Sequence, residues 1–554
     1  MNTRNNFPRA AGMWLATLFI SGFAQAQTLE PALGTQPAVV APAIAPLSAE
    51  ASAVRSAVHS AFGAGSEVAQ GYQGIGFKPV WLDTSGKPTD AARVLLSTLK
   101  AAGNHALPAS KYRAVQLESQ FGTAGWALEA ALTRSFVEYA QDMRAGVLNP
   151  RDIDSELHIY PERPSAGDLL WSVSRATDMT AYLDALAPQD PAYQRLVERY
   201  AAYRAMGAEP IWGDRVASGR TIRPGNQNAR VAQARARLTA MGDLDPNIYD
   251  KTVNLDADGT QLAANDVTTD IPLPAFDPSL FDAPMADALR RFQERHGLNL
   301  DGVIGPATLK QLNVSPQTRA RQIAVTLERM RWLNRDRGDR HILVKLAGCT
   351  MAVINNGTEE FSSRTVIGKA KEHRTPEFSD EMTHMVVNPS WYVPTSIKEK
   401  EIMPKVKADP NYLAKRNMRM QSNGRIVQGP GPRNALGTVK FMFPNKFAIY
   451  LHDTPSKRLF KRDVRAYSHG CVRVERPHEL AHHLLGAQQS DPAGYFRRLL
   501  NRGKERRVDL DDPLPVHITY RTAWIDHNGV EQFRGDIYRR DAQIAKALAA
   551  AGAI

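Results

Sequence analysis

The spacing of hydrophobic residues divides the chain into stretches of different character. Between residues 51 and 218, apolar positions recur every three or four residues, as in residues 91–99 and 132–140. This spacing puts the apolar side chains on one face of a helix. We therefore expect a helical domain over residues 51–218, with Trp81 as a core residue.

A second helical module is expected over residues 219–316. In its second half Met285, Leu289 and Phe292 form an apolar stripe at helical spacing. Residues 245–284, which contain several Asp and Pro, lie between the two halves of this pattern. We interpret residues 245–284 as an insertion within a small helical module.

A connecting helix is expected over residues 317–340. After it, apolar residues recur at every second position. Alternation of apolar and polar residues is typical of strands with one buried face. We therefore expect a mostly antiparallel β-domain over residues 341–525 and a helical tail over residues 526–554. The first short strands are expected at residues 341–346, 351–354, 365–368 and 384–387.

One stretch of the β-domain breaks this alternation. Residues 395–436, approximately, are rich in Lys and Arg, begin with a helical segment and end in a loop rich in Gly and Pro. We expect an inserted lid subdomain here, and a solvated basic excursion is the alternative. Taken together, the patterns predict a multidomain α+β protein.

The N-terminus has the pattern of a secretory signal. Arg4 and Arg9 accompany an apolar run over residues 10–23, which ends in a small-x-small cleavage site. The run is shorter than the ~20 residues that a membrane-spanning helix needs. We expect a signal peptide over residues 1–26, with an uncleaved anchor as the alternative, and a Pro- and Ala-rich linker over residues 27–50.

The composition adds a basic excess, with a formal net charge of +12. Such an excess suits nucleic acid, an anionic membrane face or an acidic polymer as partner. Export removes most of the case for nucleic acid. An anionic polymer outside the cytoplasm is then the simplest partner, and a diffuse basic surface without a specific partner is the alternative.

Candidate chemistry is densest in residues 467–473, which read Tyr-Ser-His-Gly-Cys-Val-Arg. Cys471 is one of only two cysteines and follows a glycine that allows a sharp turn. A thiol nucleophile needs an imidazole to take its proton, and His452 is the candidate. A lone cysteine is more often a small buried residue, but polar and charged neighbours favour an exposed turn. A disulfide with Cys349 is not expected, because it would consume the nucleophile.

Residues 468–473 resemble the signature of the L,D-transpeptidases, whose YkuD-like catalytic domain has an upstream His followed by Ser/Thr-His/Asn-Gly-Cys-x-Arg. Residues 79–83 and 144–150 are similar to the helical scaffold domain of the large multidomain Gram-negative members. Residues 219–316 resemble the small three-helix peptidoglycan-binding module. The resemblance implies acyl transfer from the third residue of a peptidoglycan tetrapeptide stem, with release of D-alanine, to an amine acceptor.

The same resemblance implies roles for particular residues. Cys471 would be the acylated nucleophile, and His452 would accept and donate the proton. Backbone amides of His469, Gly470 and Cys471 would bind the oxyanion, and Arg473 would hold the turn or meet a substrate carboxylate. No metal and no organic cofactor is implied. The candidate substrate-binding residues are Ser468, Tyr450, Trp391 and Tyr392, and the aromatic ones among them are equally suited to a core.

Partners and location follow from the resemblance as well. It implies a periplasmic enzyme of the Gram-negative envelope that acts on peptidoglycan, contacts the membrane only through an uncleaved signal and is acylated by carbapenem-type β-lactams. The third residue of another stem is the expected acceptor, which would form cell-wall cross-links. A free D-amino acid and a lysine of an anchored lipoprotein are the alternatives.

Two competing functions remain open at this point. Residues 478–482, His-Glu-Leu-Ala-His, satisfy the H-E-x-x-H pattern of zinc metalloproteases, in which two histidines one helical turn apart bind zinc. The pattern has only three fixed positions, so a histidine-rich helix surface is the simpler interpretation. The other alternative is a non-catalytic wall-binding scaffold, which the intact His452 and Cys471 motifs disfavour.

Overall fold

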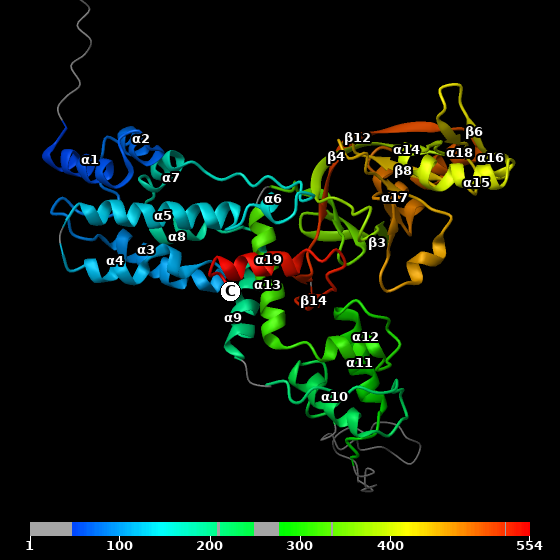
Figure 1. Ribbon diagram of the computed structural model, residues 1–554, viewed down its shortest axis with the longest axis horizontal. Coiled ribbons are helices and arrows are strands. Elements are labelled where there is room, and N and C mark those ends of the chain that lie inside the picture. The colour runs from blue at the N-terminus through cyan, green and yellow to red at the C-terminus, as the bar shows by residue number, and fades with distance from the viewer. Residues whose placement is uncertain (1–46, 124, 208–210, 249–275, 334–335, 527) are drawn as a thin grey trace, which may run out of the picture. The chain divides into compact units, whose positions relative to one another are not determined.

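A computed structural model of the chain describes residues 47–123, 125–207, 211–248, 276–333, 336–526 and 528–554 (Figure 1). The expected signal segment, residues 1–26, lies outside these ranges. So do most of the expected linker 27–50 and most of the expected insertion 245–284. Among the described residues, none of the helices combines the length and hydrophobicity that a bilayer span requires.

The N-terminal region is helical, as predicted (Figure 1). Trp81 is fully buried and donates through Nε1 to Thr133 Oγ1 at 3.0 Å, which confirms it as a core residue. Glu129, also on α5, accepts from the amides of Trp81 and Leu82 at 3.1 Å. The helices are α1 Ala49–Phe62, α2 Glu67–Gly74, α3 Asp90–Ala101, α4 Ala114–Gln120, α5 Ala127–Ala145, α6 Pro150–Ile153, α7 Ala166–Val173, α8 Met179–Asp184 and α9 Pro191–Ala205, with 3₁₀ turns at Ala102–His105 and Ala109–Tyr112.

Three helices form the following module: α10 Ala229–Ala240, α11 Ala283–Arg295 and α12 Pro306–Leu312. Met285, Leu289 and Phe292 lie on α11 and are fully buried against α10 residues, so the predicted apolar stripe is the core of this module. Because α11 begins at Ala283, its first residues belong to the stretch that the sequence assigned to the insertion.

The connecting helix α13, Pro316–Trp332, is shorter than the sequence suggested and ends well before residue 340. It packs against α9, α5 and the C-terminal helix α19, Asp541–Ala550. Apolar residues buried between these elements include Val325, Ile544 and Leu548. Arg329 and Arg331 on α13 are also buried, so this helix lies in the interior and carries charge there.

The β-domain is built on a nine-stranded sheet with the order β10-β3-β11-β9-β8-β4-β12-β1-β2. Strands β4 and β12 run side by side as a long antiparallel pair (Figure 1). Three pairings, β1–β12, β9–β11 and β3–β10, are parallel and the others antiparallel, which confirms a mostly antiparallel sheet. Strand β2 also pairs with β3. The run of strands from β3 to β2 is therefore hydrogen-bonded at both ends and forms a closed sheet. The strands are β1 Arg340–Lys345, β2 Thr350–Asn355, β3 Thr358–Gly368, β4 Phe378–Val387, β8 Val439–Met442, β9 Leu451–His452, β10 Ala466–Ser468, β11 Val472–Val474 and β12 Arg506–Thr519.

A separate small subdomain interrupts the sheet between β4 and β8, where the sequence predicted a lid. Its three-stranded sheet has the order β5-β7-β6, and its own core contains Val393, Ile402 and Ile426. The elements are β5 Trp391–Tyr392, α14 Thr395–Ile397, a π-helical turn at Lys398–Ile402, α15 Met403–Ala408, α16 Tyr412–Lys415, β6 Met418–Met420 and β7 Ile426–Gln428. We call residues 391–434 the lid.

The remaining elements follow the sheet or complete it. A 3₁₀ turn, Lys457–Lys461, precedes β10, and the helices α17 Pro477–Leu485 and α18 Pro492–Asn501 connect β11 to β12. The segment 526–554 was predicted to be helical, and α19 lies in it. It also contains β14 Glu531–Phe533, which pairs in a hairpin with β13 Ala523–Ile525.

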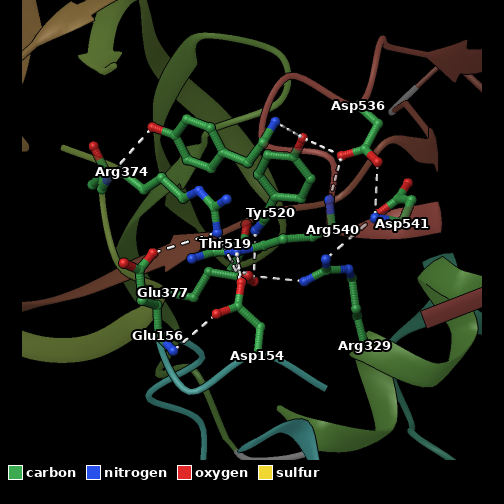
Figure 2. Close-up of polar contacts among 12 residues, drawn as sticks. Asp154, Glu156, Arg329, Arg374, Glu377, Thr519, Tyr520, Asp536, Arg540 and Asp541 are labelled. Carbon is green, nitrogen blue, oxygen red and sulfur yellow. Dashed lines mark hydrogen bonds and ion pairs between the residues drawn. The ribbon is translucent and has the colours of Figure 1, made fainter. Parts of the chain in front are cut away.

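Buried charges join the helical region to the sheet (Figure 2). Glu377, which precedes β4 and is 1% exposed, accepts from Arg329 Nη1 at 2.8 Å and from Arg540 Nη1 at 3.3 Å. Its other oxygen accepts from the amide of Tyr520 at 3.0 Å. Arg540 Nε also donates to Asp154, which follows α6, at 3.4 Å. The carboxylate of Glu377 therefore neutralises two buried guanidinium groups at once.

Candidate active site

The predicted base lies on β9, and the predicted nucleophile Cys471 directly precedes β11, the parallel strand beside it. In the pairing of β11 with β9, Val472 lies opposite Leu451 and Arg473 lies opposite His452. Val472 and Leu451 are fully buried in the core. Because side chains alternate between the two faces of a strand, Arg473 and His452 belong to the other face, together with Cys471 two residues earlier. We call this the catalytic face.

The turn before Cys471 is fixed by hydroxyl groups. Ser468, which is buried, donates through Oγ to the Cys471 carbonyl at 2.5 Å and accepts from the Gly470 amide at 3.2 Å. Gly470 has φ = 117°, a conformation that residues with a side chain rarely adopt. Thr375, in the β3–β4 loop, donates through Oγ1 to the Gly470 carbonyl at 2.6 Å. Ser468 was expected at the substrate, but its hydroxyl holds the turn.

The three amides expected at an oxyanion are not equivalent. The Gly470 amide is already bonded to Ser468. Within the described part of the chain, the amides of His469 and Cys471 donate to no other group. These two N–H groups of the turn are therefore available to donate hydrogen bonds to a negatively charged oxygen.

The thiol of Cys471 is half-buried. Sγ lies 3.7 Å from the carbonyl oxygen of Ala448, and the Tyr450 hydroxyl is hydrogen-bonded to it. Burial raises the pKa of the Cys471 thiol, and the Tyr450 bonds and the charges of Arg473 and Lys440 oppose that rise. No hydrogen bond joins the thiol to His452 among the described residues, so proton transfer between them requires a shift of one side chain. Catalytic hydrogen bonds often tighten only when substrate is bound.

His452 is positioned to act as a neutral base. Its ring is 4% exposed, and its Nδ1 donates to the carbonyl oxygen of Asp453 at 2.5 Å. Since a carbonyl oxygen can only accept, this bond fixes the proton on Nδ1. The backbone of Leu436 also hydrogen-bonds to the ring. Burial, together with the charge of Arg473, lowers the pKa of His452 to about 3.

Two cations share the catalytic face with the thiol. Arg473 forms no ion pair with any described carboxylate, and its buried Nε has no hydrogen-bond partner. Lys440 on β8 lies opposite His452, and its ammonium is 5.9 Å from the centre of the Tyr450 ring. Burial lowers the pKa of both groups. An unpaired guanidinium and an ammonium beside a nucleophile suit a substrate that carries a carboxylate.

The lid contacts the catalytic turn through His469. Its Nε2 lies 2.5 Å from Glu401 Oε1, and Glu401 belongs to the π-helical turn of the lid. The ring of His469 also lies against His373, with centroids 4.7 Å apart. Of the other lid residues expected at the site, Trp391 packs on the lid core and Tyr392 is 59% exposed. Neither has a described contact with the catalytic turn.

The residues of the alternative zinc pattern have other partners. His478 Nε2 lies 2.7 Å from Thr438 Oγ1, and Glu479 is paired with Arg476. The rings of His478 and His482 both pack against Phe496. Over the described ranges, no three His, Cys, Asp or Glu side chains gather as a metal site would require.

The functional groups that sequence analysis missed come from distant strands and loops. Lys440, Thr375 and Glu401 are all brought to the turn by the sheet or the lid. Lys440 alone had a sequence signal, because it lies in a short strand-like stretch at the end of the Gly-rich loop. Thr375 lies in a segment without periodicity, and Glu401 lies in a stretch predicted to be helical, where nothing in the sequence points to His469 as its partner.

The pH dependence of thiol reactivity should show a single alkaline limb. Because the pKa of Cys471 is raised and that of His452 is about 3, neither group titrates between pH 5 and 7. We expect the rate of alkylation by iodoacetamide to rise with pH through and beyond ~8.5, the ordinary pKa of a thiol. Tyr450→Phe, which removes a donor to the thiolate, should move the rise to higher pH. A plateau already reached near pH 7 would contradict the assignment of a neutral thiol and imidazole.

Three family models match the chain. The L,D-transpeptidase catalytic domain (YkuD) model matches residues 339–510, and the scaffold domain model matches residues 66–199. A model described as "Putative peptidoglycan binding domain" matches residues 267–312. The first of these matches contains the whole catalytic face.

Two curated relatives match parts of the chain. The "Putative L,D-transpeptidase" of Haemophilus influenzae is 32% identical over 263 residues, which are 43% of this chain and 50% of that protein. N-acetylmuramoyl-L-alanine amidase CwlM of Mycobacterium tuberculosis is 35% identical over 94 residues, 17% of this chain and 18% of that protein. The chain thus spans about half the length of the first of these relatives and less of the second.

Solved structures resemble the chain only distantly. L,D-transpeptidase 3 from Mycobacterium tuberculosis is 14% identical with a TM-score of 0.18, over 33% of this chain and 61% of that one. The L,D-transpeptidase (Yku) from Stackebrandtia nassauensis is 13% identical with a TM-score of 0.21, over 55% of this chain and 97% of that one. Global similarity this low bears on neither fold nor function.

Proposed function

Since this chain carries an L,D-transpeptidase catalytic domain of the YkuD family, with a scaffold domain and a peptidoglycan-binding domain, we propose that it transfers acyl groups between peptide stems of peptidoglycan. The observation that carries the proposal is that Cys471 directly precedes β11 while His452 lies on β9, the parallel strand paired with β11. The donor is the carbonyl of the third residue of a tetrapeptide stem. The leaving group is the terminal D-alanine.

In the first half-reaction Cys471 Sγ attacks the donor carbonyl and forms a tetrahedral intermediate. His452 Nε2 takes the thiol proton and passes it to the nitrogen of D-alanine as the amide bond breaks, which leaves a thioester. The amides of His469 and Cys471 donate to the oxyanion. Removing one such donor costs about 3–4 kcal/mol of transition-state stabilisation in comparable sites.

In the second half-reaction an acceptor amine attacks the thioester. His452 takes the proton of that amine and returns it to the sulfur as the thioester breaks, so the free thiol is regenerated and a new amide bond has formed. One neutral imidazole serves both steps. The acceptor is the third residue of another stem, and the product is a cross-link.

Substrate carboxylates should bind beside the thiol. The D-alanine carboxylate of the donor stem is the nearest charged group to the bond that breaks. Arg473 and Lys440, which flank Cys471 on the catalytic face, are the groups available to neutralise it. The same thiol is expected to open carbapenem-type β-lactams and carry them as an acyl adduct.

The accessory regions and the location fit the same function. The small helical module, matched by the peptidoglycan-binding model, would keep the enzyme on the wall. A substrate of this kind requires an extracytoplasmic protein, and we propose the periplasm of a Gram-negative envelope, reached through the N-terminal signal. Neither a metal nor an organic cofactor takes part in either half-reaction.

Purified tetrapeptide muropeptides test this function and its acceptor. Incubation followed by mass analysis should give a dimer that retains one D-alanine. If the terminal residue is exchanged for an added D-amino acid and no dimer forms, the main reaction is exchange and not cross-linking. Recovery of unchanged tetrapeptide, with neither free D-alanine nor dimer, would refute acyl transfer.

The lid should favour amine acceptors over water. Glu401 ties it to His469 of the catalytic turn, so Glu401→Ala should let water reach the thioester and raise the ratio of tripeptide to dimer by about threefold or more. Glu399→Ala is the matched control, because Glu399 is an exposed glutamate of the same π-helical turn. An unchanged ratio in a folded Glu401→Ala protein would count against the lid.

A further inference from the structure

A large cleft is lined by β1 and by segments around it, at residues other than those of the catalytic face. Its volume is about 1150 Å³, and His341, Leu343 and Lys345 of β1 line it. The residues between them on β1, Ile342 and Val344, point into the core. Within the described residues, neither Cys471 nor any other residue of the catalytic face belongs to this cleft. Whatever binds here does so independently of the acyl transfer proposed above.

Half-buried cations with few carboxylate contacts mark the inner part of the cleft. Lys345 makes no ion pair with a described carboxylate, and Arg534 gives its N–H groups to two backbone carbonyls and to Gln532 Oε1. Arg521 is 4.0 Å from Asp190, at the limit of an ion pair, and its buried Nε has no hydrogen-bond partner. Burial and repulsion from a neighbouring guanidinium group, Arg337 for Arg521 and Arg465 for Arg534, lower the pKa of each of them to about 10.

The acidic residues of the cleft compensate these cations only in part, and Asp190 is the one that reaches Arg521. Asp526 accepts from the amide of Val530 and from Gln532 Nε2, both at 2.9 Å, and closes its own turn. Asp190 pairs with Arg337 at 2.5 Å. The others are exposed at the rim, where water screens their charge. They are Glu162, Glu294, Asp336, Asp339 and Glu359.

An aromatic ring and a histidine complete the inner part. Trp524 lies between Lys345, at 5.6 Å, and Arg534, at 4.7 Å from its ring centre. His341 donates through Nδ1 to the Gly338 carbonyl at 2.8 Å, and its buried Nε2 has no partner. In this tautomer Nε2 can accept a hydrogen bond, for example from a hydroxyl group.

We propose that this cleft is a second ligand site, which binds the carboxylate or phosphate group of a small ligand through Lys345, Arg521 and Arg534. An oxyanion placed among these cations would relieve their repulsion and satisfy the unpaired Nε of Arg521. A hydroxyl group on the same ligand would satisfy His341. Stem-peptide carboxylates and phosphate groups of the envelope are the two sources of this chemistry.

Calorimetric titration of the full chain with citrate and with inorganic phosphate tests the site. At constant ionic strength, with chloride as the reference anion, at least one probe should give saturable binding. Lys345→Met should weaken that binding about tenfold or more, because it removes a charged donor. Lys345→Arg should restore it, and Lys78→Met, at an exposed lysine of the helical region, should leave it unchanged.

The outcomes distinguish the two sources. Binding of citrate but not phosphate assigns the site to carboxylates, and binding of phosphate alone assigns it to phosphate groups. Arg521→Gln removes a second cation of the cleft and should weaken the same probe about as much, which provides a test if Lys345→Met fails to fold. Saturation by neither anion, or equal affinity in the folded Lys345→Met and Arg521→Gln proteins, would overturn the proposal.

Discussion

Replacing Cys471 by alanine should abolish both half-reactions, because no other group on the catalytic face can form an acyl-enzyme. The tetrapeptide should be recovered intact, without tripeptide, dimer or free D-alanine. A carbapenem should add its mass to the unchanged protein and not to Cys471→Ala. The reaction products and the carbapenem adduct should therefore be absent, not merely formed more slowly.

The matched control for this prediction is a variant that lacks both histidines of the alternative zinc pattern. His478→Ala combined with His482→Ala should leave turnover largely intact, since these rings pack against Phe496 on α17 and α18. A thiol alkylator should inactivate the enzyme and a strong chelator should not. Turnover that survives in Cys471→Ala, or that a chelator removes and zinc restores, would reverse the assignment.

Replacing Glu377 by alanine should lower the free energy of unfolding by about 3–5 kcal/mol, the range expected when one partner of a buried ion pair is removed. The change would leave Arg329 and Arg540, each 1% exposed, without this carboxylate. It would also remove the acceptor of the Tyr520 amide. Urea unfolding of the full chain, followed by tryptophan fluorescence, measures the loss.

Glu156→Gln is the control for the Glu377 variant. Glu156 reaches the same network through Arg374 at 3.4 Å, but its side chain is 61% exposed. An exposed ion pair contributes about 0–1 kcal/mol. Equal effects of the two substitutions would mean that burial of Glu377 does not determine the stability of this network.

The Glu377 variant should also be a poorer enzyme. Glu377 lies two residues after Thr375, whose hydroxyl donates to the Gly470 carbonyl at 2.6 Å and accepts from the Gly368 amide at 3.0 Å. Loosening this loop removes a support of the catalytic turn. A displacement of about 1 Å can cost two orders of magnitude in rate.

The parts of the fold that sequence analysis anticipated are those with local signals. Helical spacing identified the buried face of α11 through Met285, Leu289 and Phe292. Alternation identified all or part of each of the first four strands, and a break in that alternation identified the subdomain inserted between β4 and β8. The motif around Cys471 and the upstream His452 pointed to two strands that the structure pairs in parallel.

What could not be anticipated depends on contacts between distant segments. The buried guanidinium groups of α13 look like an exposed helix face in the sequence, because a charged residue is buried only when a partner elsewhere compensates it. Arg329 finds its partners Glu377 and Asp541 in other segments. The partner of the Gly470 amide was also not anticipated. This amide was expected to be free for an oxyanion, but it donates to Ser468.

The parallel pairing of β1 with β12, Ile342 opposite Val516, has a consequence for how the chain folds. Both strands of that pair must be available before the sheet can close. The hydrogen bond between Arg540 and Asp154 likewise joins residues 386 positions apart. Contacts so distant along the chain make folding slow. Until β12 arrives, β1 presents an unpaired edge on which another chain could add. A chain with this topology is therefore open to strand addition by a second copy while it folds.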